Sequence, residues 1–213
     1  MKTEQLIDIL STNVESVKRG QVGRTLAAAL AVGGVAAFCL MLATVGLRPD
    51  VAGGAHLGFM AVKLLFTLSL IGVGAALLVR SMHPGRDARK AIAFILVPFV
   101  AIVLAGLIAL GFGGPAAWGG MVLGGEWAAC LACIPLFALI PFAALIWALR
   151  KAAPTNLTRA GAVAGVIAGA LGAAVYAFHC PDDSVPFIAI WYGAPIALFA
   201  FIGAKLGPRL LRW

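Results

Sequence analysis

The sequence predicts an all-α integral membrane protein, a bundle of six transmembrane helices with a short amphipathic helix before it. Hydrophobic residues make up 62% of the 213 residues and charged residues 11%, with a mean hydropathy of +1.04, whereas a soluble domain is about 25% charged. Six charge-poor runs each have the roughly 17–25 residues that a helix needs to cross about 30 Å of hydrocarbon. None of them alternates in polarity like the strands of an outer-membrane barrel.

The six runs are interpreted as helices because an open strand leaves unpaired backbone groups in lipid. They cover residues 25–47, 57–79, 91–110, 128–149, 160–178 and 187–204. The chain then divides into a cytoplasmic segment, residues 1–24, a transmembrane domain, residues 25–206, and a cytoplasmic tail, residues 207–213. Within the fifth span Gly161, Gly165 and Gly169 recur at four-residue spacing, which predicts a central helix that packs closely against its neighbours.

The basic residues predict the orientation of the bundle. Fourteen of the sixteen lie on one side of the membrane: before the first span, between the second and third spans, between the fourth and fifth spans, or after the last. They are Lys2, Lys18, Arg19, Arg24, Arg80, Arg86, Arg89, Lys90, Arg150, Lys151, Arg159, Lys205, Arg209 and Arg212. By the positive-inside rule both termini are cytoplasmic. The net charge of +8 is therefore a matter of topology, and we expect no direct binding of nucleic acid.

Arg48 and Lys63 are the basic residues of the other half of the molecule. Lys63 falls inside the second span, near its outer end. We expect its long side chain to snorkel to the outer membrane interface. The alternative is an ion pair with one of four outer carboxylates: Asp50, Glu126, Asp182 or Asp183.

The four cysteines are distributed unevenly. Cys39 is expected to be buried in the middle of the first span, where a thiol acts as a small hydrophobic group. In EWAACLACIP, residues 126–135, Cys130 and Cys133 share one face of the fourth helix, and Cys180 follows the fifth helix in FHCPDD, residues 178–183. Cys130 and Cys180 are thus expected at similar depth on the oxidising side of the membrane, where disulfides persist.

Three interpretations of these outer cysteines remain open. They are a thiol pair, a metal site, or small residues that fill a helix contact. A metal site would use Cys130, Cys133, His179 and Cys180, with Glu126 as a further ligand, although their spacing matches no standard zinc motif. Nearby carboxylates, those of Glu126, Asp182 and Asp183, are expected to raise the pKa of a thiol here.

The first twenty residues, MKTEQLIDILSTNVESVKRG, predict an amphipathic helix. Its apolar stripe is Leu6, Ile7, Leu10, Val14 and Val17, opposite Glu4, Asp8 and Glu15. Such a helix docks in the groove of a partner. The alternative is a helix that packs on its own bundle.

The opening MKTEQLIDIL, the six spans and the outer cysteines of EWAACLACIP and FHCPDD together resemble the NrsF-like family, the negative regulators of sigma-F among bacterial anti-sigma factors. The resemblance implies a multi-pass protein of the bacterial inner membrane, not an enzyme and without a resident cofactor. It would hold an extracytoplasmic-function (ECF) sigma factor inactive at its cytoplasmic face and release it under envelope stress, from a heavy-metal ion or an oxidant. The sensing pair of the family corresponds to Cys130 and Cys180, and Cys133 is an addition.

For sigma-factor binding we expect the stripe of Leu6, Ile7, Leu10 and Val14, with Glu4 and Asp8 meeting a basic sigma surface. Two other functions compete with this interpretation. A small metal ion permease or carrier could use the same cysteines as its entrance. A membrane thiol oxidoreductase would need a fourth outer cysteine, and Cys39 is expected to lie too deep to serve.

Overall fold

The computed structural model describes residues 3–5, 20–49, 57–81, 93–152 and 154–212. These residues include six helical segments that are long and apolar enough to cross a membrane and contain no strand, so the predicted all-α fold is confirmed. The long helices are α2 (Gln21–Thr44), α3 (Leu57–Ser81), α5 (Leu96–Gly113), α7 (Trp127–Arg150), α8 (Leu157–Tyr176) and α10 (Gly193–Leu210).

Short elements join some of these helices. A 3-10 turn, Ala93–Ile95, leads into α5, and another, Pro115–Ala117, is followed by α6 (Trp118–Leu123) on the way to α7. The sixth segment opens with α9 (Val185–Phe187) and a π-helical stretch, Ile188–Tyr192, before α10. The sequence analysis did not anticipate α6 or the π-helical stretch, and it ended the last span at residue 204, whereas α10 continues to Leu210.

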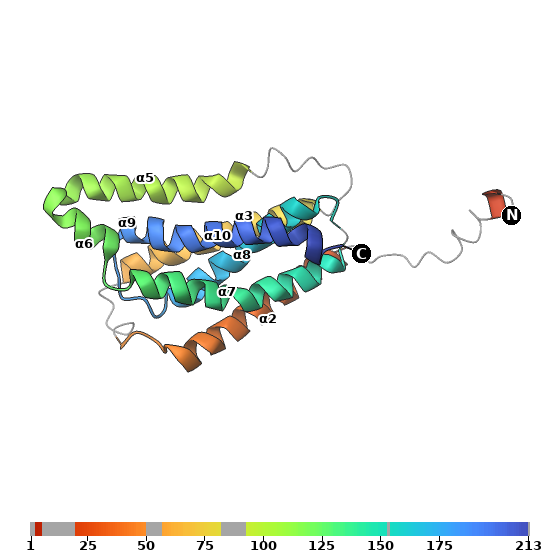
Figure 1. Cartoon of the computed structure of the whole chain (residues 1–213), viewed down its shortest axis with the longest axis horizontal. Helices are drawn as coiled ribbons and strands as arrows, with labels where there is room; N and C mark the ends of the chain where they lie inside the picture. Colours follow the sequence, from red (N-terminus) through yellow and green to blue (C-terminus); the bar gives the residue numbers. More distant parts are fainter. Residues whose placement is uncertain (1–2, 6–19, 50–56, 82–92, 153, 213) are drawn as a thin grey trace.

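Helix α8 lies at the centre of the bundle, between α7, α10 and α3 (Figure 1). In the most apolar stretch of this helix 78% of the residues are buried, compared with 22% in the third segment, which contains α5. Figure 1 shows α5 along one side of the molecule and α2 along the opposite side. The glycine spacing of the fifth span therefore predicted the central helix correctly.

Glycines let α8 touch its neighbours backbone to backbone. A Cβ atom at Gly161 or Gly165 would collide with the carbonyl oxygens of Gly203 and Phe199 on α10. On the side of α7, a Cβ at Gly172 would lie 2.6 Å from the carbonyl oxygen of Ile134. In lipid, where hydrophobic burial does not drive association, close contacts of this kind hold helices together through van der Waals packing.

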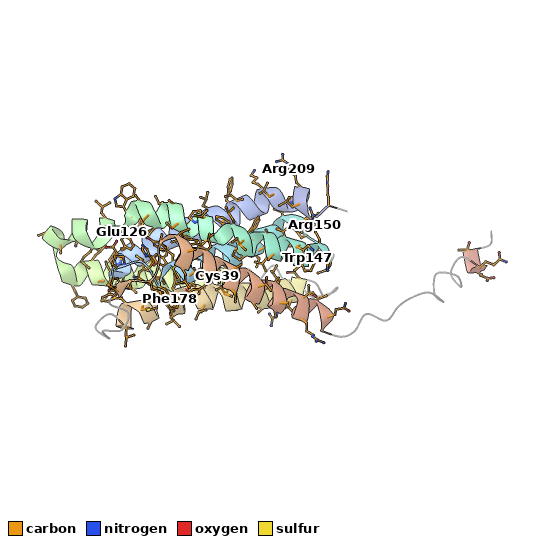
Figure 2. The ribbon with its side chains drawn as sticks, turned by 90° about the horizontal axis from the view of Figure 1, so that it is seen from below. Cys39, Glu126, Trp147, Arg150, Phe178 and Arg209 are labelled. Carbon is orange, nitrogen blue, oxygen red and sulfur yellow. The ribbon has the colours of Figure 1, made fainter. Side chains whose placement is uncertain are left out.

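The bundle has two chemically different ends, which Figure 2 shows through the labelled Glu126 at one end and Arg150 and Arg209 at the other. We call the first the cysteine end, formed by residues 45–49, 114–126 and 177–186. The second is the basic end, where α7 stops at Arg150, α8 begins and α10 stops. At the basic end Asn156 caps α8 by accepting a hydrogen bond from the backbone N–H of Arg159 at 2.9 Å.

Candidate functional site

Cys130 and Cys180 come together at the cysteine end. Cys130 lies in the first turn of α7, and Cys180 follows the end of α8. Both side chains are fully buried as free thiols. They lie within hydrogen-bonding reach of each other. The expected meeting of these residues at similar depth is therefore found in the structure.

The loop that carries Cys180 also anchors the helix that carries Cys130. The carboxylate of Asp182 accepts hydrogen bonds from the backbone N–H groups of Gly125, at 3.0 Å, and Glu126, at 2.8 Å. These groups lie at the start of α7, where a helix leaves its N–H groups without internal partners and favours negative charge. Asp182 thus fixes the distance between the two segments on which the thiols lie.

A buried ion cluster holds the Cys180 loop from the other side. The Lys63 ammonium on α3 donates to the backbone carbonyl of Cys180 at 2.9 Å and pairs with Asp183 at 3.2 Å. Arg48, which follows α2, pairs with the other carboxylate oxygen of Asp183 at 3.3 Å and also donates to the Cys180 carbonyl at 3.3 Å. The Lys63 side chain is 0% exposed, so the expected snorkelling is wrong and the alternative, an ion pair, is correct.

The cluster affects the pKa values of two acidic groups, the Cys180 thiol and the Asp183 carboxyl. The pKa of the Cys180 thiol is lowered to about 7; the hydrogen bond from Cys130 is the largest cause, burial opposes it, and the charge of Lys63 lowers it further. The expectation that nearby carboxylates raise this pKa is therefore wrong for Cys180, because the hydrogen bond from Cys130 and the charge of Lys63 outweigh the effect of burial. Burial alone would raise the pKa of Asp183, but the hydrogen bonds and charges of Arg48 and Lys63 outweigh burial and lower it.

Two tyrosines complete the surroundings of the thiol pair. Tyr176, at the end of α8, lies against Cys130, and Tyr192, at the end of the π-helical stretch, lies against Cys180. Both side chains are 0% exposed, and neither hydroxyl has an oxygen or nitrogen hydrogen-bond partner. The two rings are neighbours, with centroids 6.4 Å apart. The site is therefore a buried cluster of two thiols and two phenol groups.

The other candidate residues lie near this buried cluster. Cys133 is half-buried on α7, and His179 Nδ1 forms a hydrogen bond with the carbonyl oxygen of Gly46 at 3.1 Å. Glu126 is partly buried, and its own N–H is bound by Asp182. In the part of the chain that the structure describes, no group of three or more His, Cys, Asp or Glu side chains is arranged to hold a metal ion.

Cys39 differs from its expected position. Its side chain is exposed on the surface of α2 and not buried. The neighbouring Phe38 packs edge to face on Phe178, with centroids 5.6 Å apart, so Cys39 lies near the level of the cysteine end (Figure 2). The residue faces away from the bundle and does not join the Cys130 and Cys180 pair.

The predicted sigma-binding stripe falls mainly outside the described residues. The structure does not describe Leu6, Ile7, Asp8, Leu10 or Val14, nor does it describe Asp50. Glu4 lies in the described stretch of residues 3–5 and is exposed.

Sequence reasoning missed Tyr176, Tyr192 and the role of Arg48. One signal was present for Arg48: it and Lys63 are the basic residues that break the charge segregation, and both converge on Asp183. No comparable signal marks the tyrosines, because an aromatic residue at the end of a transmembrane helix is ordinary.

Comparison with known proteins identifies the family of the chain. The family described as NrsF, "Negative regulator of sigma F", matches residues 10–213. The chain is 35% identical over 217 residues to "Anti-sigma-F factor NrsF" of Caulobacter vibrioides and 30% identical over 213 residues to "Probable anti-sigma-F factor NrsF" of Azospira oryzae, in each case over the full length of both chains. No solved structure matches the chain. The chain therefore belongs to the NrsF family of negative regulators of sigma F, a regulatory and not an enzymatic family.

Proposed function

We propose that this protein is an anti-sigma factor of the bacterial inner membrane, which holds an ECF sigma factor at its cytoplasmic face and releases it under envelope stress. Membership of the NrsF family and the names of two full-length relatives support the anti-sigma role. The segregation of basic residues supports cytoplasmic termini, with the basic end inside and the cysteine end outside. Sigma-factor binding then belongs to the amino-terminal stripe of Leu6, Ile7, Leu10 and Val14.

The observation that carries the sensing half of the proposal is the contact between the Cys130 and Cys180 thiols. They are buried together on two segments that are tied by Asp182. An oxidant that takes up two electrons and the two thiol protons joins the sulfur atoms in a disulfide. A thiophilic metal ion bound by both sulfurs is a second form of the same signal, in which the protons are displaced.

Either event changes the packing at the cysteine end. A disulfide brings the sulfur atoms to about 2.05 Å, closer than two thiols in contact, so the Cys180 loop and the start of α7 must move relative to each other. Helix α7 continues to the basic end, where the Arg150 side chain donates to the carbonyl oxygen of Leu210 on α10 at 2.5 Å. Since packed helix contacts switch between discrete arrangements, a shift of α7 can alter the sigma-binding face.

The sensing role is tested by replacing both thiols. In cells that carry Cys130→Ser with Cys180→Ser, induction of sigma-dependent transcription by cadmium or by a hydroperoxide should fall to the uninduced level, because neither bond can form. Cys133→Ser and Cys39→Ser are matched controls from the same chain and should respond like the parent. Undiminished induction in the double variant would refute the proposed sensor.

The binding role is tested by deleting residues 1–20. The shortened chain should still insert in the membrane, because all six spans remain, but should no longer co-purify with its sigma factor. Retained binding would move the site to the inner loops. Metal ion flux in vesicles that contain the purified chain alone would instead favour a carrier.

A further inference from the structure

The two phenol groups beside the thiols are unusual in a buried site. Tyr176 and Tyr192 are fully buried, and their hydroxyl groups have no oxygen or nitrogen hydrogen-bond partner. A hydroxyl removed from water without a partner costs free energy, and most buried polar groups in proteins avoid this cost. Phenylalanine would fill the same space without that cost, so the hydroxyls call for an explanation beyond packing.

Their positions relate them to the thiol pair. Tyr176 reaches it from α8 and contacts Cys130, whereas Tyr192 reaches it from the π-helical stretch Ile188–Tyr192 and contacts Cys180. Single π-helical turns are rare and frequently occur at functional sites. Sulfur is a weak hydrogen-bond acceptor, so the thiols leave two strong donors essentially unused. The donors converge on the place where the two sulfur atoms meet.

We propose that the hydroxyls of Tyr176 and Tyr192 form a binding site for a single oxygen atom attached to a cysteine sulfur, and so stabilise the sulfenic acid through which a hydroperoxide oxidises the pair. This inference rests on the proposed function and deepens it, since it names hydroperoxides as the class of oxidant. In the reduced protein the donors face only the weakly accepting sulfur atoms of Cys130 and Cys180, and in the oxygenated state they have an oxygen acceptor. Interactions that exist only along the reaction path accelerate the reaction.

The chemistry balances with a hydroperoxide as the oxidant. The Cys180 sulfur, which lies on the side of Lys63, attacks the terminal oxygen: a sulfur–oxygen bond forms, the oxygen–oxygen bond breaks, and an alcohol leaves with the thiol proton. The Cys130 sulfur then attacks the sulfur of the sulfenic acid. A disulfide forms, the sulfur–oxygen bond breaks, and the oxygen leaves as water with the remaining protons. The pair loses two electrons and the hydroperoxide gains them.

The first measurement isolates the oxygen transfer. Full-length chain with Cys39→Ser, Cys133→Ser and Cys130→Ser, purified in lipid nanodiscs, retains Cys180 alone and cannot proceed to the disulfide. Cumene hydroperoxide is the oxidant, and a dimedone-type probe traps the sulfenic acid for mass spectrometry. Tyr176→Phe and Tyr192→Phe should each slow the trapping by about tenfold, as expected for loss of one hydrogen bond to a polar or charged group, and the double variant should be slower still.

Two further readouts separate this role from a structural one. Exchange of Cys180 with 2,2′-dithiodipyridine forms no sulfur–oxygen bond, so its rate should fall much less than the rate of trapping in all variants. The thermal unfolding temperature should be unchanged or higher, because each variant removes a buried hydroxyl that has no oxygen or nitrogen partner. An equal loss in both reactions, a lowered unfolding temperature, or unchanged trapping would each overturn the inference.

The outcome also distinguishes this inference from the function on which it rests. If the tyrosine variants slow trapping but cells with Cys130→Ser and Cys180→Ser still respond to stress, then the oxygen site stands and the sensing function fails. If the cysteine variants abolish the response but the tyrosine variants oxidise at the parent rate, then the sensor stands and the oxygen site fails.

Discussion

A single buried lysine determines much of the chemistry at the cysteine end. An ammonium group in a low-dielectric interior is costly unless it is paired and hydrogen-bonded. Lys63 meets both conditions through Asp183 and the Cys180 carbonyl, and Arg48 shares the same two acceptors. The two cations therefore fasten the Cys180 loop to α3 and to the segment after α2.

Replacing this lysine by an uncharged residue of similar length should loosen the loop. We expect Lys63→Met to lower the free energy of unfolding by about 1–3 kcal/mol at neutral pH, the cost of removing one partner from a buried hydrogen bond. Lys205→Met, at an exposed lysine of α10, is the matched control and should change little. Thermal unfolding in nanodiscs, followed by light scattering, measures both; equal unfolding temperatures would contradict the role of the cluster.

The loss of stability in Lys63→Met should depend on pH. Because the pKa of Asp183 is lowered in the folded protein, its ionised form stabilises the fold above the unfolded pKa of about 3.9, and this contribution is lost as the pH falls further, through the folded pKa. The difference between the parent and Lys63→Met should therefore be constant from pH 7 to about pH 5 and shrink below about pH 4. A difference that does not shrink at all below about pH 4 would contradict the assignment to Asp183.

For single residues, sequence patterns predict which side chains are exceptional but not which neighbours they contact. Charge segregation singled out Arg48 and Lys63 but could not choose between a snorkelling lysine and a paired one, because the choice depends on whether a carboxylate more than a hundred positions away lies within 4 Å. Cys39 shows the same limit. Its position within a hydrophobic span was clear, but which side of α2 faces the bundle depends on neighbours that a single sequence does not reveal.

At the scale of elements, the contact between α8 and α10 gives the bundle its centre. Gly165 lies directly against the backbone of α10, where an added Cβ would collide with the Phe199 carbonyl. The helices would have to separate to make room for it. Overpacking of this kind costs about 1–3 kcal/mol even where side chains can adjust, and backbone atoms adjust less.

Gly165→Ala should therefore destabilise the protein by about 2 kcal/mol or more and lower the yield of folded monomer. Gly72→Ala on α3 is the control, because nothing lies within 4 Å of its added Cβ, and alanine there should be neutral or stabilising by up to about 1 kcal/mol through its higher helix propensity. Size-exclusion chromatography after heating compares the two. Similar curves for both variants would contradict the packing described for α8.

Elements with a clear period were predicted well, and irregular ones were not. Four-residue glycine spacing identified α8 because the same period brings small residues to one side of a helix. Helix α6 and the π-helical stretch have no such period in the sequence, since each arises where a chain adjusts to neighbours already in place. Trp191, in the π-helical stretch, donates to the carbonyl oxygen of Val122 in α6 at 2.7 Å, so these two unpredicted elements depend on each other.

At the scale of the whole molecule, the account needs a signal to pass from the cysteine end to the basic end. Helix α7 is the most direct carrier, because it begins beside the thiols and ends beside α10. Along its length it is in close contact with α8 at Gly172 and with α2 at Gly33, where an added Cβ would lie 2.8 Å from the Cα atom of Pro141. Both contacts involve backbone atoms, so a movement of α7 must also move its neighbours or break these contacts.

One measurement tests the central claim directly. The full-length chain and its sigma factor, reconstituted together in nanodiscs, are titrated with cumene hydroperoxide, and each sample is divided to quantify the Cys130 to Cys180 disulfide by mass spectrometry and the bound sigma factor by co-purification. The account predicts that bound sigma factor falls in proportion to the disulfide and returns after reduction with dithiothreitol. Sigma factor that stays bound at full disulfide, or leaves while both thiols remain reduced, would contradict it.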